Sequence, residues 1–210
     1  MSEYTLIIGN KNFSTWSLRG YLALKHAEVD FDEIIISLRP SHDKVALKKL
    51  TPAGKVPTLV HGDYTVWDSL AIAEYLNDLY PQKTFWPKDM NMRAHARSIS
   101  SEMHSGFSTL RSKMPMACHS VFETPEMTDD LKADIDRIKH IWSECLNKYN
   151  HLGPYLFGQY SIADMMFAPV IFRFKSYQIK LPENLQNYCD EMIRLPAVQQ
   201  WLAEVDPKDL

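Results

Sequence analysis

The sequence predicts two structural parts, an α/β domain over residues 1–80 and an all-helical domain over residues 92–210. Before residue 80, short runs of β-branched and aromatic residues alternate with helical patterns. From residue 92 onward, only helical patterns recur. The segment 81–91 contains two prolines and few apolar residues, so we expect it to be the linker between the domains.

The N-terminal part is expected to follow the order β-α-β-α-β-β-α. Its β-rich runs are bounded by glycine, proline or asparagine, which favour turns. The run of three isoleucines at 34–36 predicts a strand buried on both faces. The expected strands cover 4–8, 31–37, 56–60 and 64–66, and the expected helices cover 15–25, 42–50 and the segment that follows Asp68 and Ser69.

The stretch from 55 to 76 organises this domain. Pro57 lies near the start of an apolar run, and proline donates no backbone hydrogen bond, so it suits the first position of a strand. Gly62 lies in a short polar segment that predicts a tight hairpin turn. Asp68 and Ser69 precede an apolar helical pattern, as residues that cap a helix N-terminus do.

The C-terminal part is expected to be a series of helices that are separated at prolines. The Ser161–Asp164 segment has the form of a capping box, with aspartate in its last position, and we expect it to begin a buried helix. The expected helices cover 92–113, 128–149, the segment after Ser161, the segment after Pro182, and the segment that starts at Pro196.

The composition of the chain argues against several classes of protein. The chain has 210 residues and a formal net charge of −3, which argues against a nucleic-acid-binding protein. No apolar run is long enough to span a bilayer and no secretory signal is visible, so we expect a cytoplasmic protein without a membrane partner. The cysteines are odd in number and lack metal-ligand spacing, which predicts reduced thiols and no metal site: Cys118, Cys145 and Cys189.

These motifs together resemble the cytosolic glutathione S-transferase family. The resemblance lies in Val-Pro-Thr-Leu at 56–59, the hairpin, Asp68-Ser69, and Leu-Ala-Ile-Ala-Glu-Tyr-Leu at 70–76. It implies a thioredoxin-like N-terminal domain that binds glutathione and a helical domain that lines the electrophile pocket. It also implies a cis bond between Val56 and Pro57, backbone pairing there with the glutathione peptide, and an Asp68-Ser69 pair that holds the γ-glutamyl end. A helix N-terminus suits that carboxylate on physical grounds as well.

Glutathione chemistry requires a thiolate, and a hydroxyl that donates a hydrogen bond to sulfur favours the charged form. The segment 12–19, Asn-Phe-Ser-Thr-Trp-Ser-Leu-Arg, resembles the zeta-class pattern Ser-Ser-Cys-Ser-Trp-Arg-x-Arg. In that class the favoured serine lies five residues before the first arginine, and counting back from Arg19 gives Ser14. The theta-like spacing of four gives Thr15 as the fallback. No tyrosine or cysteine occupies this position, so the resemblance implies a bacterial, serine-type enzyme of zeta- or theta-like character.

Further site residues are expected on both domains. Lys55 fits a side chain that reaches the peptide, and His42 fits one that meets the glycine carboxylate. On the first helix of the second domain, His104, Phe107 and Arg111 follow one another at helical spacing, which predicts a stripe facing the electrophile. A solvated or dimer-facing surface remains the alternative for that stripe.

The resemblance implies an enzyme that activates glutathione, its co-substrate, for attack on small electrophiles, as in detoxification. It leaves two alternatives open. One is a zeta-like, glutathione-dependent isomerase of the maleylacetoacetate isomerase type, acting on an unsaturated diacid. The other is a non-enzymatic binding protein with the same fold. In each case the family implies a homodimer.

Overall fold

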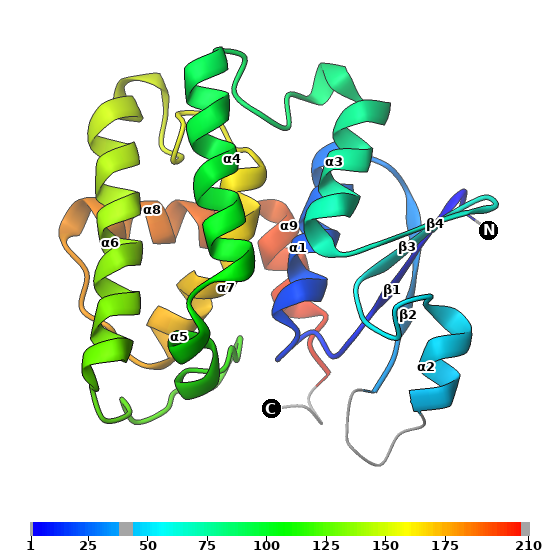
Figure 1. Cartoon of the computed structure of the whole chain (residues 1–210), viewed down its shortest axis with the longest axis horizontal. Coiled ribbons are helices and arrows are strands. Elements are labelled where there is room, and N and C mark those ends of the chain that lie inside the picture. Colours follow the sequence, from blue (N-terminus) through cyan, green and yellow to red (C-terminus); the bar gives the residue numbers. More distant parts are fainter. Residues whose placement is uncertain (1, 38–43, 207–210) are drawn as a thin grey trace.

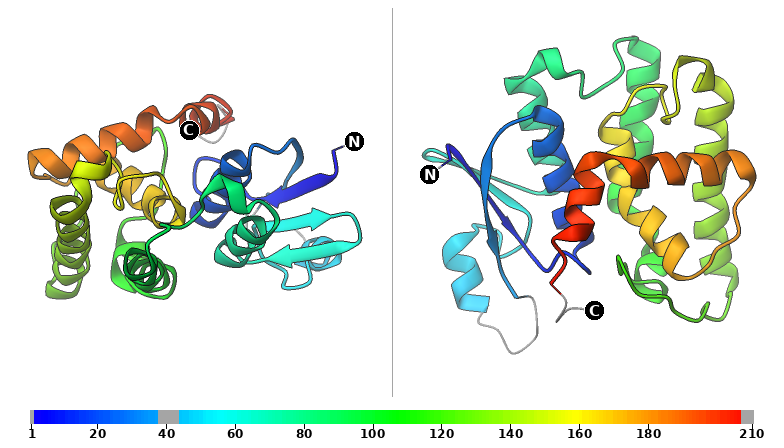
Figure 2. Two further views of the ribbon diagram at one scale, coloured as in Figure 1. Left: turned by 90° about the horizontal axis from the view of Figure 1, so that it is seen from above. Right: turned by 180° about the vertical axis from the view of Figure 1, so that it is seen from behind.

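The computed structural model describes residues 2–37 and 44–206 (Figure 1). A four-stranded sheet forms the core of the N-terminal part, and a group of helices forms the C-terminal part beside it. Helices α1 (Thr15–Ala27) and α3 (Ser69–Leu79) lie between the sheet and the C-terminal helices, while α2 (Lys44–Leu50) lies on the other face of the sheet (Figures 1 and 2). None of the described helices is long and apolar enough to cross a membrane.

The sheet has the strand order β2-β1-β3-β4. Strand β1 runs parallel to β2 and antiparallel to β3, which forms an antiparallel hairpin with β4 through a turn at Gly62, where φ is 56°. Because β1 is central, Leu6 and Ile8 on it are fully buried. The strand bounds are β1 Tyr4–Ile8, β2 Phe31–Ile35, β3 Thr58–His61 and β4 Tyr64–Trp67.

The prediction that the isoleucine run at 34–36 is buried on both faces is wrong. Ile34 is 41 % exposed and Ile35 is 57 % exposed. Strand β2 lies at the edge of the sheet and has β1 as its neighbour on one side only, so its apolar side chains are less covered than those of a central strand.

Helix α1 packs closely on both the sheet side and the C-terminal side, and all its residues from Ser17 to Leu24 are buried. A Cβ atom at Gly20 would lie only 3.0 Å from the Pro57 ring, so glycine allows the helix to approach the loop before β3. On the opposite side, Arg19 Nε donates a hydrogen bond to the backbone oxygen of Met166 at 3.0 Å. Helix α1 therefore joins the two parts of the molecule.

The C-terminal part is helical, as predicted, although the domain limits at 80 and 92 remain a prediction. Helix α7 runs through its centre, and the Ser161–Asp164 capping box at its start is formed. The carboxylate of Asp164 accepts hydrogen bonds from the backbone N–H groups of Ser161 and Leu156. The helices are α4 Met90–Ser105, α5 Ser108–Lys113, α6 Asp129–Tyr149, α7 Ile162–Ser176, α8 Glu183–Arg194 and α9 Pro196–Ala203.

The single helix predicted over 92–113 is instead two helices, α4 and α5, with a break at Gly106 and Phe107. Phe107 adopts a left-handed conformation with φ of 60°. A Cβ atom at Gly106 would lie 2.8 Å from the Glu102 carbonyl oxygen, so the break depends on glycine there. The Arg111 side chain donates hydrogen bonds to the backbone oxygens of Gly106 and Met103, which satisfies carbonyls at the end of α4.

Candidate functional site

A cavity of about 520 Å³ lies where the start of α1, the loop before β3, the β4–α3 junction and α4 meet. Its lining includes most of the residues predicted for the glutathione site, together with His104 from the C-terminal part. Trp16 and Trp67, which the sequence analysis did not select, complete the walls. The lining residues are Trp16, Ala53, Lys55, Val56, Pro57, Trp67, Asp68, Ser69 and His104.

The Val56–Pro57 peptide bond is cis, as predicted. Pro57 is buried, whereas Val56 lies outside any strand and has no backbone hydrogen bond to the described residues. The peptide groups of Val56 are therefore available to a ligand in the cavity. Lys55, which precedes them, has an exposed side chain at the rim.

Asp68 has a strained backbone and a double role. Its φ of 79° is rare for a residue other than glycine and costs about 1–3 kcal/mol. One carboxylate oxygen caps α3 by accepting hydrogen bonds from the backbone N–H groups of Leu70 and Ala71. The other oxygen lies 3.0 Å from His104 Nε2, so the contact links the β4–α3 junction to α4 across the cavity. Strained residues of this kind are common in ligand-binding sites.

Two buried polar atoms beside the cavity lack a partner among the described residues. Ser69 is 1 % exposed, and its hydroxyl oxygen makes no hydrogen bond there. The Nδ1 atom of His104 is also buried and makes no hydrogen bond with the described residues. Buried polar atoms without a partner cost about 1–3 kcal/mol each, so these two atoms are available to hydrogen-bond a polar ligand.

Ser14 lies at the N-cap of α1, next to the cavity but not among the residues that line it. It is buried and donates its hydroxyl proton to Ser17 Oγ at 2.7 Å. Ser17 Oγ also accepts a hydrogen bond from the Gly9 backbone. Thr15, the fallback, is the first residue of α1 and is also buried.

Two positively charged side chains, Arg19 and Arg111, lie against the Trp16 ring. The guanidinium carbons of Arg19 and Arg111 lie 4.6 Å and 4.8 Å from the centre of the Trp16 ring. Burial lowers the pKa of the Arg19 guanidinium, and its Nη1 atom has no hydrogen-bond partner among the described residues. Together with the N-terminus of α1, these groups create a positive potential near Trp16, which favours an anion there.

The predicted stripe of His104, Phe107 and Arg111 does not run along one helix, because the break between α4 and α5 separates its members. His104 lines the cavity beside Asp68, Phe107 is buried, and Arg111 reaches Trp16. His42 lies outside the described residues. Trp16 and Trp67 could have been found in the sequence, since each directly adjoins a selected residue.

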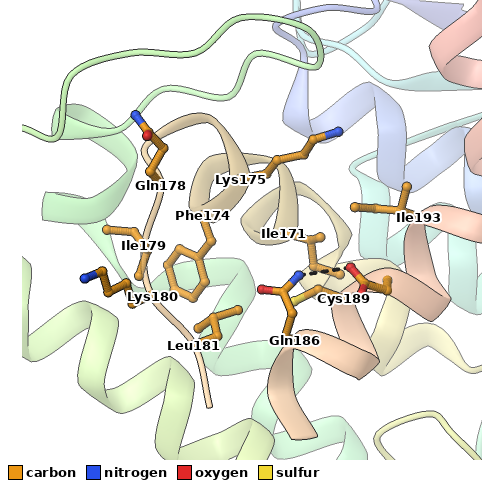
Figure 3. A pocket seen from close by; sticks show the side chains of 11 residues that line it. Ile171, Phe174, Lys175, Gln178, Ile179, Lys180, Leu181, Gln186, Cys189 and Ile193 are labelled. Atoms are coloured by element: carbon orange, nitrogen blue, oxygen red, sulfur yellow. Dashed lines mark hydrogen bonds between the residues drawn. The ribbon is translucent and has the colours of Figure 1, made fainter. Parts of the chain in front are cut away.

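A second cavity, of about 690 Å³, lies between α7, α8 and the segment that joins them (Figure 3). Its walls mix apolar side chains, such as Phe174 and Ile179, with polar and charged ones, and burial raises the pKa of the Cys189 thiol to about 12. It contains none of the predicted site residues, so volume alone does not locate the site. Among the described residues, no group of three or more histidine, cysteine or acidic side chains is placed to hold a metal ion.

Known proteins resemble the chain along nearly its whole length. The family model described as the N-terminal domain of glutathione S-transferase matches residues 13–79. A probable maleylacetoacetate isomerase of Caenorhabditis elegans is 32 % identical over 194 residues, which cover 87 % of this chain and 85 % of that protein. A glutathione S-transferase of Triticum aestivum is 29 % identical over 199 residues, covering 92 % and 91 %. The chain belongs to the cytosolic glutathione S-transferase family.

Solved structures confirm the predicted fold class, a thioredoxin-like N-terminal domain followed by a helical C-terminal region. A Burkholderia glutathione transferase homologue with bound glutathione superposes with a TM-score of 0.72 at 24 % identity, covering 96 % of each chain. A theta-class enzyme of Xanthomonas axonopodis pv. citri, also with glutathione bound, has a TM-score of 0.71 at 23 % identity, covering 96 % of this chain and 98 % of that one.

The strain at Asp68 predicts an unusual substitution pattern. Asp68→Gly should destabilise the protein less than Asp68→Ala, because glycine adopts positive φ freely. Asp89 is the control, since its carboxylate also caps a helix, α4, by accepting the Met92 backbone N–H, but at an ordinary φ of −64°. We expect the alanine-to-glycine difference in unfolding free energy, measured with urea, to be larger at 68 than at 89 by about 1 kcal/mol or more. Equal differences at the two positions would contradict the strained geometry.

Proposed function

We propose that this chain is a glutathione transferase that binds glutathione in the cavity between α3 and α4 and activates its thiol for attack on small electrophiles. The observation that carries the proposal is the buried, unpaired Ser69 hydroxyl beside the strained Asp68. Glutathione offers the complementary groups, which are a γ-glutamyl ammonium and carboxylate, a peptide backbone and a thiol.

The γ-glutamyl end binds at the start of α3. Its carboxylate receives hydrogen bonds from the Ser69 hydroxyl and from the positive N-terminus of the helix. Its ammonium group meets the Asp68 carboxylate, whose second oxygen already faces His104. The peptide then extends along Val56, whose free backbone groups supply the pairing.

The thiol lies toward the start of α1. Ser14 is the hydroxyl that donates to sulfur, after rotation of its side chain away from Ser17. The N-terminal dipole of α1 and the Arg19 guanidinium behind Trp16 add positive potential, which lowers the pKa of a bound thiol further. Lys55 at the rim reaches the glutathione peptide, and His42 is proposed for the glycine carboxylate.

A second candidate function is glutathione-dependent isomerisation of an unsaturated diacid. The relative with 32 % identity is a probable maleylacetoacetate isomerase. The two guanidinium groups against Trp16 would attract an acidic substrate more strongly than a neutral one. In this reaction the thiolate adds to the double bond and is released after rotation, so glutathione is regenerated.

We also propose a cytoplasmic homodimer, as in the family. Exposed apolar side chains in both parts of the chain support the dimer, with Tyr64 74 % exposed on β4 and Met90 70 % exposed at the start of α4. The free, buried cysteines suit a reducing compartment. Sedimentation of only a monomer at micromolar concentration would contradict the dimer.

The Ser14 assignment predicts a change in rate rather than in affinity. Ser14→Ala should lower turnover by roughly tenfold or more, a barrier increase of at least about 1.4 kcal/mol. The pH at half-maximal rate should rise, because the thiolate loses a stabilising donor, while glutathione binding persists. Asp68→Ala should weaken binding and leave the pH profile in place, since the γ-glutamyl end is remote from sulfur.

Thr15→Ala is the matched control for these measurements. If it removes turnover and shifts the pH profile while Ser14→Ala does not, the activating hydroxyl is Thr15 and the spacing of four applies. If neither variant changes the pH profile, a side-chain hydroxyl at this position does not activate the thiol. Glutathione binding without turnover on any electrophile would favour the non-enzymatic alternative.

The transferase and the isomerase differ in what happens to glutathione. With a cis-unsaturated diacid, an isomerase should convert substrate while the free thiol concentration stays constant, whereas a transferase should consume one thiol for each conjugate formed. The dimethyl ester of the same diacid is the control for charge. The positive potential behind Trp16 predicts a higher kcat/KM for the diacid than for the ester, and equal values would remove the electrostatic support for an acidic substrate.

A further inference from the structure

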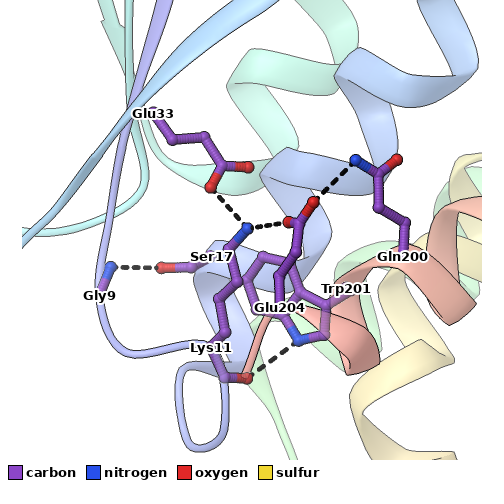
Figure 4. Close-up of polar contacts among 7 residues, drawn as sticks. All are labelled: Gly9, Lys11, Ser17, Glu33, Gln200, Trp201 and Glu204. Atoms are coloured by element: carbon purple, nitrogen blue, oxygen red, sulfur yellow. Dashed lines mark hydrogen bonds and ion pairs between the residues drawn. The ribbon is translucent and has the colours of Figure 1, made fainter. Parts of the chain in front are cut away.

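Lys11 is a buried cation in the loop that leads to Ser14. Its ammonium nitrogen lies 2.6 Å from a Glu33 carboxylate oxygen on β2 and 2.5 Å from a Glu204 carboxylate oxygen at the end of α9 (Figure 4). The same nitrogen lies 5.3 Å and 5.2 Å from the ring centres of Tyr21 and Trp201. The Lys11 ammonium group therefore contacts side chains from the sheet, from α1 and from α9.

The backbone of the same loop is also bound by the C-terminal part. The Trp201 indole N–H donates a hydrogen bond to the Lys11 carbonyl oxygen at 2.9 Å. The Cys118 backbone N–H donates to Asn12 Oδ1 at 2.7 Å, and the Cys118 thiol donates to the Lys11 carbonyl oxygen at 3.5 Å. The loop is thus held from the C-terminal side by two separate segments.

Hydrogen bonds within the loop connect the segment around Lys11 to Ser14. Asn10 Oδ1 accepts hydrogen bonds from the backbone N–H groups of Asn12 and Phe13 at 2.8 Å and 3.1 Å. The Ser14 backbone N–H donates to the Asn10 carbonyl oxygen at 2.9 Å. Lys11 and Ser14 therefore lie in one loop whose backbone is held by its own hydrogen bonds, and Ser14 is the residue whose hydroxyl is proposed to reach sulfur.

We propose that Lys11 is a positioning residue for thiol activation and that α9, through Glu204 and Trp201, is a functional part of the thiol site. The inference rests on the proposed role of Ser14. Burying an ammonium group is costly, and packed apolar residues would hold the two parts together at least as well. What the ion cluster adds is a fixed geometry, and a donor to a thiolate must be placed to within about 0.5 Å to be effective.

Lys11→Met tests the proposal, because methionine keeps an unbranched side chain and removes the charge. We expect turnover with glutathione to fall by roughly tenfold, the pH at half-maximal rate to rise, and the glutathione dissociation constant to change little. Glu204→Gln, which keeps the shape of the partner and its contact with Gln200, should shift the pH profile in the same direction by a smaller amount. This milder variant keeps the test valid if Lys11→Met folds poorly.

Lys83→Met is the matched control. Lys83 also forms an ion pair with a glutamate of the N-terminal part, Glu28, but among the described residues neither side chain forms a hydrogen bond or ion pair with the loop. The control should keep the wild-type pH profile. If Lys11→Met and Glu204→Gln are less stable but keep that profile, Lys11 is only structural and the inference is overturned. If the wild-type protein binds no glutathione, the proposed function fails and the inference fails with it. If the wild-type protein is active but the variants keep its pH profile, only the inference fails.

Discussion

The packing of α1 between the sheet and α7 holds the two parts of the molecule together. The helix is buried on both sides, so its register fixes where its N-terminus emerges. Gly20 admits the Pro57 ring on one side, and Arg19 reaches the Met166 carbonyl oxygen on the other. The loop before β3, the start of α1 and the core helix of the C-terminal part are thereby held in one arrangement, and the cavity lies at their junction.

Partial and full positive charges lie around the cavity. Helices α1 and α3 both begin there, and their N-terminal N–H groups favour anions. Arg19 and Arg111 add their charge through Trp16, while Asp68 supplies the one carboxylate among the lining residues. A ligand with a carboxylate, a nearby ammonium group and a thiolate matches this distribution better than a neutral ligand does.

Local signals in the sequence were sufficient for the N-terminal elements and for the Pro57 and Asp68 positions, because turn and capping chemistry acts over a few residues. Other features depend on tertiary packing. The exposure of Ile35 follows from the position of β2 at the sheet edge, which a single strand does not reveal. The left-handed Phe107 interrupts a good helical pattern, and the contact of His104 with Asp68 joins residues from the two parts of the chain.

A crystal structure of the protein soaked with glutathione tests whether glutathione occupies the cavity between α3 and α4. We expect the γ-glutamyl carboxylate at the Ser69 hydroxyl, the peptide paired with the Val56 backbone, and the sulfur within hydrogen-bond distance of Ser14. Glutathione bound instead in the cavity between α7 and α8, or bound here with the sulfur turned away from the start of α1, would contradict it.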